Sequence, residues 1–253
     1  MIRALYTIVL LAGLVVLAPV FLWRGIRHRK YLGSLGARLG RVDAGPSELR
    51  TLWVHAVSVG ELLAAEALIR RLATDTPGWR VVVSTTTATG QQLAMERFPE
   101  LAVFYFPLDL PWSARRAIRR IAPDVVCFVE TEIWPNFLAE CRRRNVRVAV
   151  VNGRLSDRSY RGYARARRLL APFLQAIDRF LMQTEADATR IRQLGADAAC
   201  VEVTGNLKYD VDGGAVERRV AALRPELEQA FGLPDSRPLV LAGSTAEGEE
   251  AML

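Results

Sequence analysis

Short apolar runs alternate along the chain with segments in which apolar residues recur every three or four positions. The runs predict buried strands, and the recurring positions predict helices with one buried face. The predicted strands are Leu52–Val57, Arg80–Thr85, Val103–Phe106, Val125–Glu130, Val146–Asn152, Arg179–Gln183 and Cys200–Thr204. The predicted helices are Glu61–Ala73, Thr89–Phe98, Trp112–Ile121, Trp134–Arg144, Tyr160–Ala176 and Glu185–Leu194. This alternation favours an α/β domain whose parallel sheet is covered on both faces.

The N-terminal segment has a different pattern. Ala4–Trp23 is 20 residues long and carries no charged side chain. At about 1.5 Å per residue, a helix of this length crosses the roughly 30 Å hydrocarbon layer of a bilayer. A cleaved signal peptide has a shorter apolar region that ends in small residues, whereas this run ends in Phe21-Leu22-Trp23. We therefore expect one uncleaved transmembrane helix.

The net charge of +7 lies beside this helix. Residues 1–41 contain seven basic side chains and no acidic one, so the rest of the chain is balanced. A nucleic-acid-binding protein needs its basic excess on the folded body, so we expect a membrane and no nucleic acid as partner. Basic residues follow the helix from Arg24 to Lys30, against Arg3 before it. The positive-inside rule then places the body in the cytoplasm.

Several kinds of site are excluded by composition. The three cysteines show no CxxC spacing, and two histidines are too few for a histidine-rich metal centre. The chain also contains no GxSxG, no GxxxxGK[ST] and no GxGxxG after a strand. From the cysteine spacing and the small number of histidines, we expect no metal.

In parallel α/β sheets, ligands bind at the carboxyl ends of the strands. Ser58-Val59-Gly60-Glu61 follows the first predicted strand, where Gly60 permits a tight turn. Glu61 is either a helix-start carboxylate that complements the helix dipole, which is common, or a general base.

Two carboxylates, Glu130 and Glu132, follow the apolar run Val125–Val129. Because strand side chains alternate between faces, we expect the two to share a side and the pKa of one to be raised. The pattern fits an acid–base site and an ordinary polar loop equally well.

Basic residues mark two later strand ends. Residues 154–168, which follow the strand end at Asn152, contain six arginines and one acid. Their planar guanidinium groups suit phosphate, although they could equally pair with acids elsewhere. Lys208 is one of only two lysines among 34 basic residues, which indicates a local need for a compact ammonium group.

The pattern changes after Asp210. Asp210–Leu233 is charged and helical, and Pro238–Ser244 has the pattern of a new buried strand. A strand and half a helix are too little for a core. We divide the chain into an anchor (residues 1–23), a basic juxtamembrane segment (24–50), an α/β domain (51–210), a helix and linker (211–237) and the start of a second domain (238–253).

Taken in order, these loops resemble the Kdo transferases, the 3-deoxy-D-manno-octulosonic acid transferases of lipopolysaccharide synthesis. The resemblance covers nearly the whole chain. It is carried by Trp53–Glu61 (WVHAVSVGE), Glu130–Asn136 (ETEIWPN), Asn152–Ser156 (NGRLS), Thr204–Asp210 (TGNLKYD) and Ala242–Thr245 (AGST) with Gly248–Glu250.

The resemblance implies a GT-B-type glycosyltransferase, with two Rossmann-like domains behind one transmembrane helix. Such enzymes move Kdo from CMP-Kdo to a lipid A precursor, with inversion, at the cytoplasmic face of the bacterial inner membrane. No cofactor is implied, since CMP-Kdo is the donor substrate. The first domain receives the acceptor, and the second, only begun here, holds the donor.

Motif positions imply residue roles. Glu61 matches the general base, and Glu130 and Lys208 match residues that stabilise the transition state. The implied acceptor-binding residues are Ser58, Gly60, Glu132, Asn152, Arg154 and Arg158. The implied donor-binding residues are Gly243, Ser244 and Thr245.

Because the second domain is only begun, we expect little or no transferase activity from this chain alone. Two alternatives stay open. One is a GT-B transferase for another envelope sugar, and the other is a non-catalytic membrane-anchored module that binds an anionic lipid.

Overall fold

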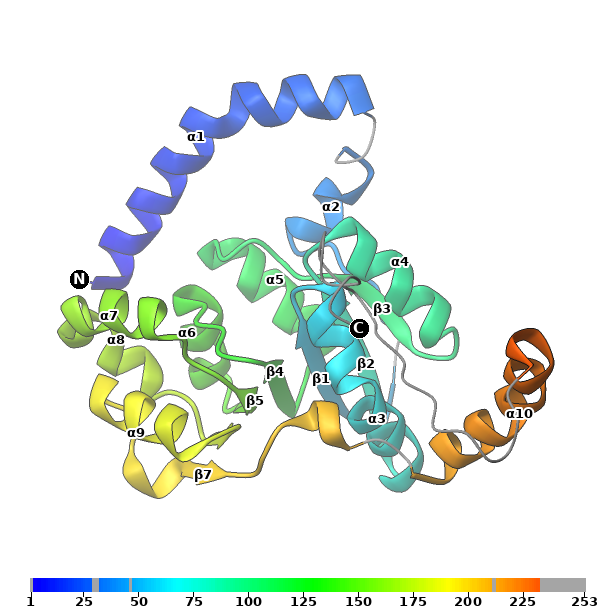
Figure 1. Cartoon of the computed structure of the whole chain (residues 1–253). Coiled ribbons are helices and arrows are strands. Elements are labelled where there is room, and N and C mark those ends of the chain that lie inside the picture. The colour runs from blue at the N-terminus through cyan, green and yellow to red at the C-terminus, as the bar shows by residue number, and fades with distance from the viewer. Residues whose placement is uncertain (1, 29–31, 46, 211–212, 233–253) are drawn as a thin grey trace, which may run out of the picture. The chain divides into compact units, whose positions relative to one another are not determined.

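The computed structural model describes residues 2–28, 32–45, 47–210 and 213–232 (Figure 1). The chain forms two compact units, Met1–Asp210 and Val211–Leu253. The first unit holds the sheet and every candidate catalytic residue.

Within the described residues, the first unit contains a seven-stranded sheet in which every neighbouring pair is parallel. The strands are β1 (Arg50–Ala56), β2 (Trp79–Thr85), β3 (Ala102–Tyr105), β4 (Val125–Val129), β5 (Arg147–Gly153), β6 (Arg179–Met182) and β7 (Val201–Val203). Their order is β3-β2-β1-β4-β5-β6-β7, the doubly wound arrangement of Rossmann-like domains. The predicted α/β fold with a parallel sheet is confirmed.

In the first unit, α1 and α2 precede β1, and the other helices connect the strands. The helices are α1 (Ile2–His28), α2 (Leu35–Arg38), α3 (Val59–Asp75), α4 (Ala88–Arg97), α5 (Pro111–Ile121), α6 (Pro135–Arg143), α7 (Asp157–Arg165), α8 (Arg167–Leu174) and α9 (Glu185–Leu194), with 3₁₀ turns η1 (Leu32–Ser34), η2 (Ala198–Cys200) and η3 (Leu207–Tyr209).

Local sequence explains where these helices begin. Ser58, Thr87, Ser156 and Thr184 are N-caps whose hydroxyl oxygens accept a backbone N–H from the first turn. α5 and α6 instead begin with proline, which has no N–H to leave unpaired at that position.

One predicted helix is wrong in detail. The segment Tyr160–Ala176 is divided at Ala166 into α7 and α8. The Ala166 N–H bonds to the carbonyl of Tyr163, three residues back rather than four, and Ala166 has φ −102° and ψ 14°. This tightened turn ends α7 and redirects the chain.

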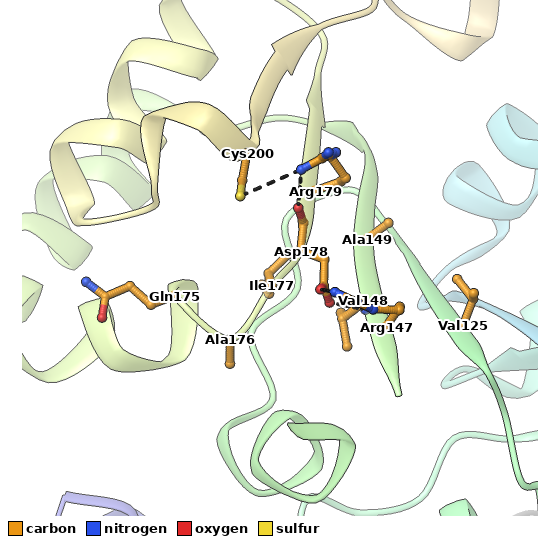
Figure 2. Close-up of a pocket in the computed structure, with 10 residues that line it drawn as sticks. All are labelled: Val125, Arg147, Val148, Ala149, Gln175, Ala176, Ile177, Asp178, Arg179 and Cys200. Carbon is orange, nitrogen blue, oxygen red and sulfur yellow. Dashed lines mark hydrogen bonds and ion pairs between the residues drawn. The ribbon is translucent and has the colours of Figure 1, made fainter. Parts of the chain in front are cut away.

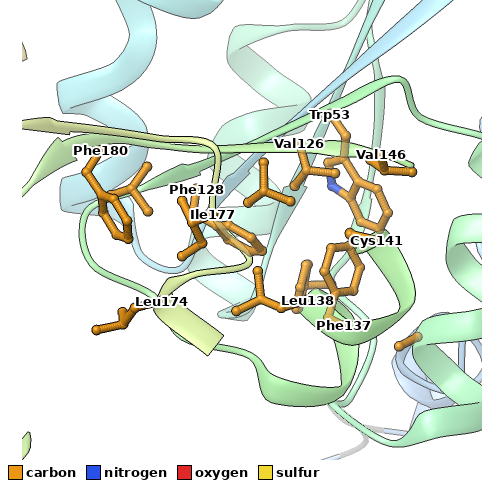
Figure 3. Close-up of a cluster of buried hydrophobic side chains, with 14 of the residues drawn as sticks. Trp53, Val126, Phe128, Phe137, Leu138, Cys141, Val146, Leu174, Ile177 and Phe180 are labelled. Carbon is orange, nitrogen blue, oxygen red and sulfur yellow. The ribbon is translucent and has the colours of Figure 1, made fainter. Parts of the chain in front are cut away.

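The core has two layers, one on each face of the sheet. Trp53, Phe128 and Phe180 point from the strands toward α5, α6, α8 and α9 (Figure 3). On the opposite face, Val54 and Val83 pack with residues of α3 and α4. Because both faces are covered, the strands are apolar along most of their length, as the sequence pattern requires.

α1 contains the apolar N-terminal segment, and Ile2–Pro19 within it has a mean hydropathy of 2.1. By length and composition this helix can cross a membrane. α1 is bent (Figure 1) and contains Pro19, the residue that most often bends a helix.

The described part of the second unit is α10 (Gly213–Phe231). It exposes large apolar side chains, among them Leu223 and Phe231. Residues 238–253, for which the sequence predicts the first strand of another domain, lie outside the described residues.

Candidate active site

The candidate residues gather at the carboxyl edge of the sheet, where β1 and β4 lie side by side. From β1 the chain continues to β2 on one side, and from β4 it continues to β5 on the other. The loops that leave β1 and β4 therefore diverge, and doubly wound sheets usually bind their ligands at this position. Glu61 lies beyond one of these strands, and Glu130 and Glu132 lie beyond the other.

Glu61 is held by the start of α3. One carboxylate oxygen accepts the Val57 N–H (2.6 Å), and the other accepts the Ser58 hydroxyl (3.0 Å). The Ser58 hydroxyl oxygen in turn accepts the Glu61 N–H, so Ser58 and Glu61 form a capping box. Burial raises the pKa of the Glu61 carboxyl, the hydrogen bonds from Val57 and Ser58 oppose that rise, and the nearby charge of Glu130 adds to it.

Glu132 is the most perturbed of the three carboxyls. Its burial, followed by the charges of Glu61 and Glu130, raises its pKa to about 7. The expectation that the pKa of one member of the pair is raised is therefore met, and Glu61, from a different strand, contributes to the rise. A carboxyl with a pKa near neutrality can exchange a proton near neutral pH.

The reason given for the proximity of Glu130 and Glu132 is wrong. β4 ends at Val129, and Glu130 has φ +62°, in the left-handed region. The Glu130 N–H still bonds to the carbonyl of Val151 on β5. The two carboxylates are thus brought together by a sharp turn and not by strand alternation. A non-glycine residue in this region stores strain, which is frequent at functional sites.

Asn152 joins two of the candidate loops. It is the penultimate residue of β5, with φ +56°, and is 2% exposed. Its Oδ1 accepts the Leu207 N–H at 3.0 Å, which ties η3 to the sheet. Its Nδ2 is buried and has no partner among the described atoms. Arg154, two residues on, donates its N–H to Thr131 Oγ1 and so connects this loop to the carboxylate loop.

Two of the candidate cations, Lys208 and Arg158, have exposed side chains. Lys208 lies on η3, which packs against α3 (Figure 1). Its side chain is exposed and makes no hydrogen bond or ion pair with any described residue. Arg158 is exposed on α7. Both side chains are available to an anionic ligand.

The tight turn expected at Gly60 is absent. Gly60 lies in the first turn of α3 without a positive φ, and a Cβ there would approach only Ser58 Oγ, at 3.9 Å. No tight turn depends on it. Gly243, Ser244 and Thr245, the expected donor-binding residues, lie outside the described residues.

His55, in the motif that leads to Glu61, is not available as a base. It is fully buried, it stacks on Phe106 with 3.9 Å between ring centroids, and its Nδ1 lies 3.1 Å from the Ser84 carbonyl oxygen. Burial lowers its pKa to about 3, so the imidazole is neutral.

The structure adds two residues that the sequence pattern did not single out. Tyr163 on α7 lies close to Glu132, and burial, together with that carboxylate, raises its pKa. Asp109 accepts the backbone N–H groups of Asn136 (3.1 Å) and Phe137 (2.7 Å) and so caps α6. Burial raises the pKa of Asp109 to about 6. No local pattern marks either residue, since each is defined by a distant partner.

Within the part of the chain that the structure describes, no group of three or more His, Cys, Asp or Glu side chains has the arrangement of a metal site. A cavity of about 530 Å³ lies at the opposite, amino edge of the sheet, lined by Arg147, Asp178, Arg179 and Cys200 among others (Figure 2). Arg147 and Asp178 form an ion pair at 2.6 Å there. Because it is at the amino edge, this cavity is separate from the carboxylate cluster.

Similarity to solved structures identifies the class of fold. A UDP-GlcNAc 2-epimerase from Neisseria meningitidis matches 74% of this chain and 55% of its own, with a TM-score of 0.52 and 15% identity. At that identity the likeness shows only a shared Rossmann-like architecture, the half of a GT-B-type arrangement.

Sequence comparison identifies the family. Residues 33–211 match the family described as 3-deoxy-D-manno-octulosonic-acid transferase (kdotransferase). The 3-deoxy-D-manno-octulosonic acid transferase of Bordetella pertussis is 36% identical over 99% of this chain and 58% of its own. A bifunctional glycosyltransferase/methyltransferase of Fusobacterium nucleatum is 32% identical over 92% of this chain and 36% of its own. The chain belongs to the Kdo transferase family, and it spans roughly half the length of these relatives or less.

Proposed function

We propose that this chain contains the acceptor-binding part of an inverting glycosyltransferase that moves Kdo from CMP-Kdo to a lipid A precursor in lipopolysaccharide synthesis. Family membership supports the type of reaction. The observation that carries the proposal is the carboxylate cluster at the β1–β4 edge, in which Glu61 and Glu132 have raised pKa values.

In this proposal Glu61 is the general base. The two hydrogen bonds from Val57 and Ser58 fix its carboxylate, and its raised pKa makes it a better proton acceptor. The acceptor hydroxyl gives its proton to Glu61 as its oxygen bonds to the anomeric carbon of Kdo. The bond from that carbon to the CMP phosphate breaks on the opposite face, which inverts the configuration.

Two further residues stabilise the transition state. Positive charge develops on the sugar ring, as in other glycosyl transfers, and the carboxylate of Glu130 offsets it. Negative charge develops on the departing phosphate, and the exposed ammonium group of Lys208 offsets that. The donor pocket and its Gly243–Thr245 segment belong to the second domain. We therefore also propose that the 253 residues alone transfer little or no Kdo.

The acceptor is bound, in this proposal, by the loops around the cluster. Glu132 and Asn152 form the floor of the acceptor site, and Ser58 and Gly60 form its wall at the start of α3. Arg154 and Arg158 bind the phosphate groups of the lipid A precursor, since guanidinium groups suit them. α1 holds the body at the bacterial inner membrane, on the cytoplasmic side.

The test is Kdo transfer by this chain joined at Leu253 to the remaining part of the Bordetella pertussis relative. With CMP-Kdo and a lipid A precursor, Glu61→Gln should reduce kcat at least about 100-fold, the lower range for a general base. Glu48→Gln, which alters an exposed carboxylate outside the site, is the matched control and should leave kcat unchanged.

Other outcomes identify the alternatives. Transfer of a different sugar, and not of Kdo, would indicate a transferase for another envelope component. Acceptor binding that is insensitive to Glu61→Gln, with no transfer by any fusion, would indicate a non-catalytic lipid-binding module. Transfer by the 253 residues alone would contradict the proposal that they need a second domain.

A further inference from the structure

Three carboxyl groups, those of Glu61, Glu130 and Glu132, share the edge of the sheet between β1 and β4, and they are not held equally. Both oxygens of the Glu61 carboxyl accept hydrogen bonds, one from the Val57 N–H at 2.6 Å and the other from the Ser58 hydroxyl at 3.0 Å. Such bonds stabilise the charged form. The Glu132 carboxyl is half-buried, and within the described part of the chain it makes no side-chain hydrogen bond and no ion pair. Glu132 thus lacks the contacts that keep Glu61 charged.

Charged and titratable groups surround Glu132 on several elements. They are Glu61 at the start of α3, Glu130 in the same loop, Tyr163 on α7, Arg154 in the loop after β5 and Lys208 on η3. Among the described residues, neither cation forms an ion pair with the cluster. Several like charges in one half-buried site cannot all stay ionised. Burial, followed by the charges of Glu61 and Glu130, raises the pKa of Glu132 to about 7, so this carboxyl binds a proton near neutral pH.

A donor without an acceptor lies beside the same loop. Asn152 follows Val151, whose carbonyl accepts the Glu130 N–H. Asn152 is 2% exposed, and its Nδ2 has no partner among the described atoms. An unpaired buried N–H is rare in native proteins, and it usually reflects a functional role or a bound water or ion. This second observation indicates that the site takes up an oxygen acceptor from outside the chain.

The transferred sugar has an acid group that comes near this cluster. Kdo is a 2-ulosonic acid, so its anomeric carbon carries the carboxylate directly. A general base lies about 3 Å from the hydroxyl oxygen that it deprotonates, and that oxygen attacks the anomeric carbon from about 3 Å. With Glu61 as the base, the sugar carboxylate comes within roughly 8 Å of the Glu61 carboxylate. An ionised Glu132 would add to the repulsion that the sugar meets, whereas a protonated one can donate to it.

We infer that Glu132 is the uncharged member of the cluster and donates a hydrogen bond from its carboxyl O–H to the carboxylate of the transferred sugar. This inference rests on the proposed function, in which the sugar is Kdo. The proton stays on Glu132, because no bond to its oxygen is made or broken in the transfer. A hydrogen bond to a charged acceptor is stronger than one between neutral groups. Glu132 therefore selects an acidic sugar over a neutral sugar of the same shape.

The first test asks whether Glu132 carries a proton in the 253-residue chain itself. Infrared spectra of the whole chain in detergent are recorded from pH 5 to pH 9, and the spectra of Glu132→Gln are subtracted. The difference should contain the C=O stretch of one protonated carboxyl, which disappears with a midpoint near pH 7. Glu48→Gln, which changes an exposed carboxylate outside the site, is the matched control and should give no such band at pH 6. A missing band at pH 6 in the Glu132→Gln difference would overturn the inference, whatever reaction the protein catalyses.

The second test measures kcat/KM for CMP-Kdo in the chain joined at Leu253 to the remaining part of the Bordetella pertussis relative. Because ionised Glu132 repels the sugar, kcat/KM of the unsubstituted fusion should fall about fivefold between pH 7 and pH 8. Glu132→Gln stays uncharged and keeps an N–H donor, so it should remove this decline, whereas Glu48→Gln should keep it. Glu132→Ala is uncharged and has no donor. At pH 6 its kcat/KM should be at least about tenfold below that of Glu132→Gln, as the loss of a hydrogen bond to a charged group implies.

The other outcomes separate this inference from the proposed function. Equal kcat/KM for Glu132→Gln and Glu132→Ala at pH 6, with transfer abolished by Glu61→Gln, would overturn the role of Glu132 and leave the proposed function intact. A decline that persists in Glu132→Gln would have the same meaning. A loss of transfer in Glu132→Gln as large as in Glu61→Gln would show that Glu132 acts in its charged form, and would also overturn the inference. If no fusion transfers Kdo, the proposed function and this inference are both wrong.

Discussion

Among single residues, the candidate site depends on three carboxyl groups that lie close together and have no basic side chain paired with them. Glu61, Glu130 and Glu132 interact with one another, and among the described residues none of them forms an ion pair. Other acids of the chain are paired, such as Glu140 with Arg143 and Arg144. An uncompensated cluster costs stability, and such a cost is common at sites that need a shifted pKa.

This crowding makes stability depend on pH through Glu132. The pKa of Glu132 is about 7 in the folded chain, whereas an unperturbed glutamate side chain has a pKa of 4.5. Folding therefore favours the protonated form. Its stabilising contribution is complete below about pH 4.5 and is lost as the pH rises to about 7. We expect Glu132→Gln to abolish this part of the decline in the free energy of unfolding between pH 5 and pH 8, measured by urea denaturation. Glu48→Gln is the control and should keep the decline.

The left-handed conformation of Glu130 gives a second prediction. Glycine adopts φ near +62° without strain, whereas alanine has the same Cβ conflict as glutamate. We expect Glu130→Gly to be more stable than Glu130→Ala by about 1 kcal/mol in chemical denaturation. Equal stabilities would mean that the turn relaxes and holds no strain. In the fused enzyme both variants should lose transfer activity, since both lack the carboxylate.

Some features of individual site residues can be predicted from the sequence, and others cannot. The S-x-x-E spacing of Ser58 and Glu61 predicts the start of α3 and the position of the Glu61 carboxylate. The interaction between Glu61 and Glu132 is not predictable in this way, because it depends on β1 and β4 being neighbours. Hydrophobic periodicity indicates that strands exist, and it carries no information on their order.

At the scale of elements, the positions of strands and helices follow the apolar pattern closely, and the exceptions have local causes. β4 is one residue shorter than predicted because Glu130 turns out of the strand. The predicted helix Tyr160–Ala176 is divided at Ala166. The first exception lies within the candidate site, where sequence-based rules for regular structure fail most often.

The attachment of η3 to the sheet can be tested. η3 is tied to the sheet by the bond from the Leu207 N–H to Asn152 Oδ1, and Lys208 follows directly. Asn152→Gly tolerates the positive φ and removes the side-chain amide, whose Oδ1 is the acceptor for Leu207. We expect amide hydrogen exchange at Leu207 to accelerate about tenfold, as the loss of one hydrogen bond implies. Exchange at Val54, in the buried centre of β1, should not change. Protection of Leu207 in the variant would show that other contacts hold η3.

At the scale of the whole molecule, the division at Asp210 separates a domain with two packed core layers from the described helix α10. All strands of the sheet lie before this boundary. The first unit therefore contains the helices that cover both faces of its sheet.

We expect a chain that ends at Asp210 to unfold within a few degrees of the Tm of the whole chain, since no residue of its two core layers is lost. Thermal denaturation followed by circular dichroism measures this. Trp53→Ala in the same shortened chain serves as the comparison. It removes a fully buried indole and should cost about 3–5 kcal/mol. A loss of cooperativity on truncation alone would mean that the first unit needs α10.

The adjacency of β1 and β4 also has a consequence for how the chain folds. β1 can associate with β2, the next strand in sequence, before it meets β4, and Leu52 and Val125 come together only when a long loop closes. Contacts between distant segments form slowly, because the entropy of loop closure is lost before they are made. The acidic cluster therefore does not exist in a chain emerging from the ribosome until β4 is complete. We expect every shorter nascent chain to be free of the repulsion among Glu61, Glu130 and Glu132.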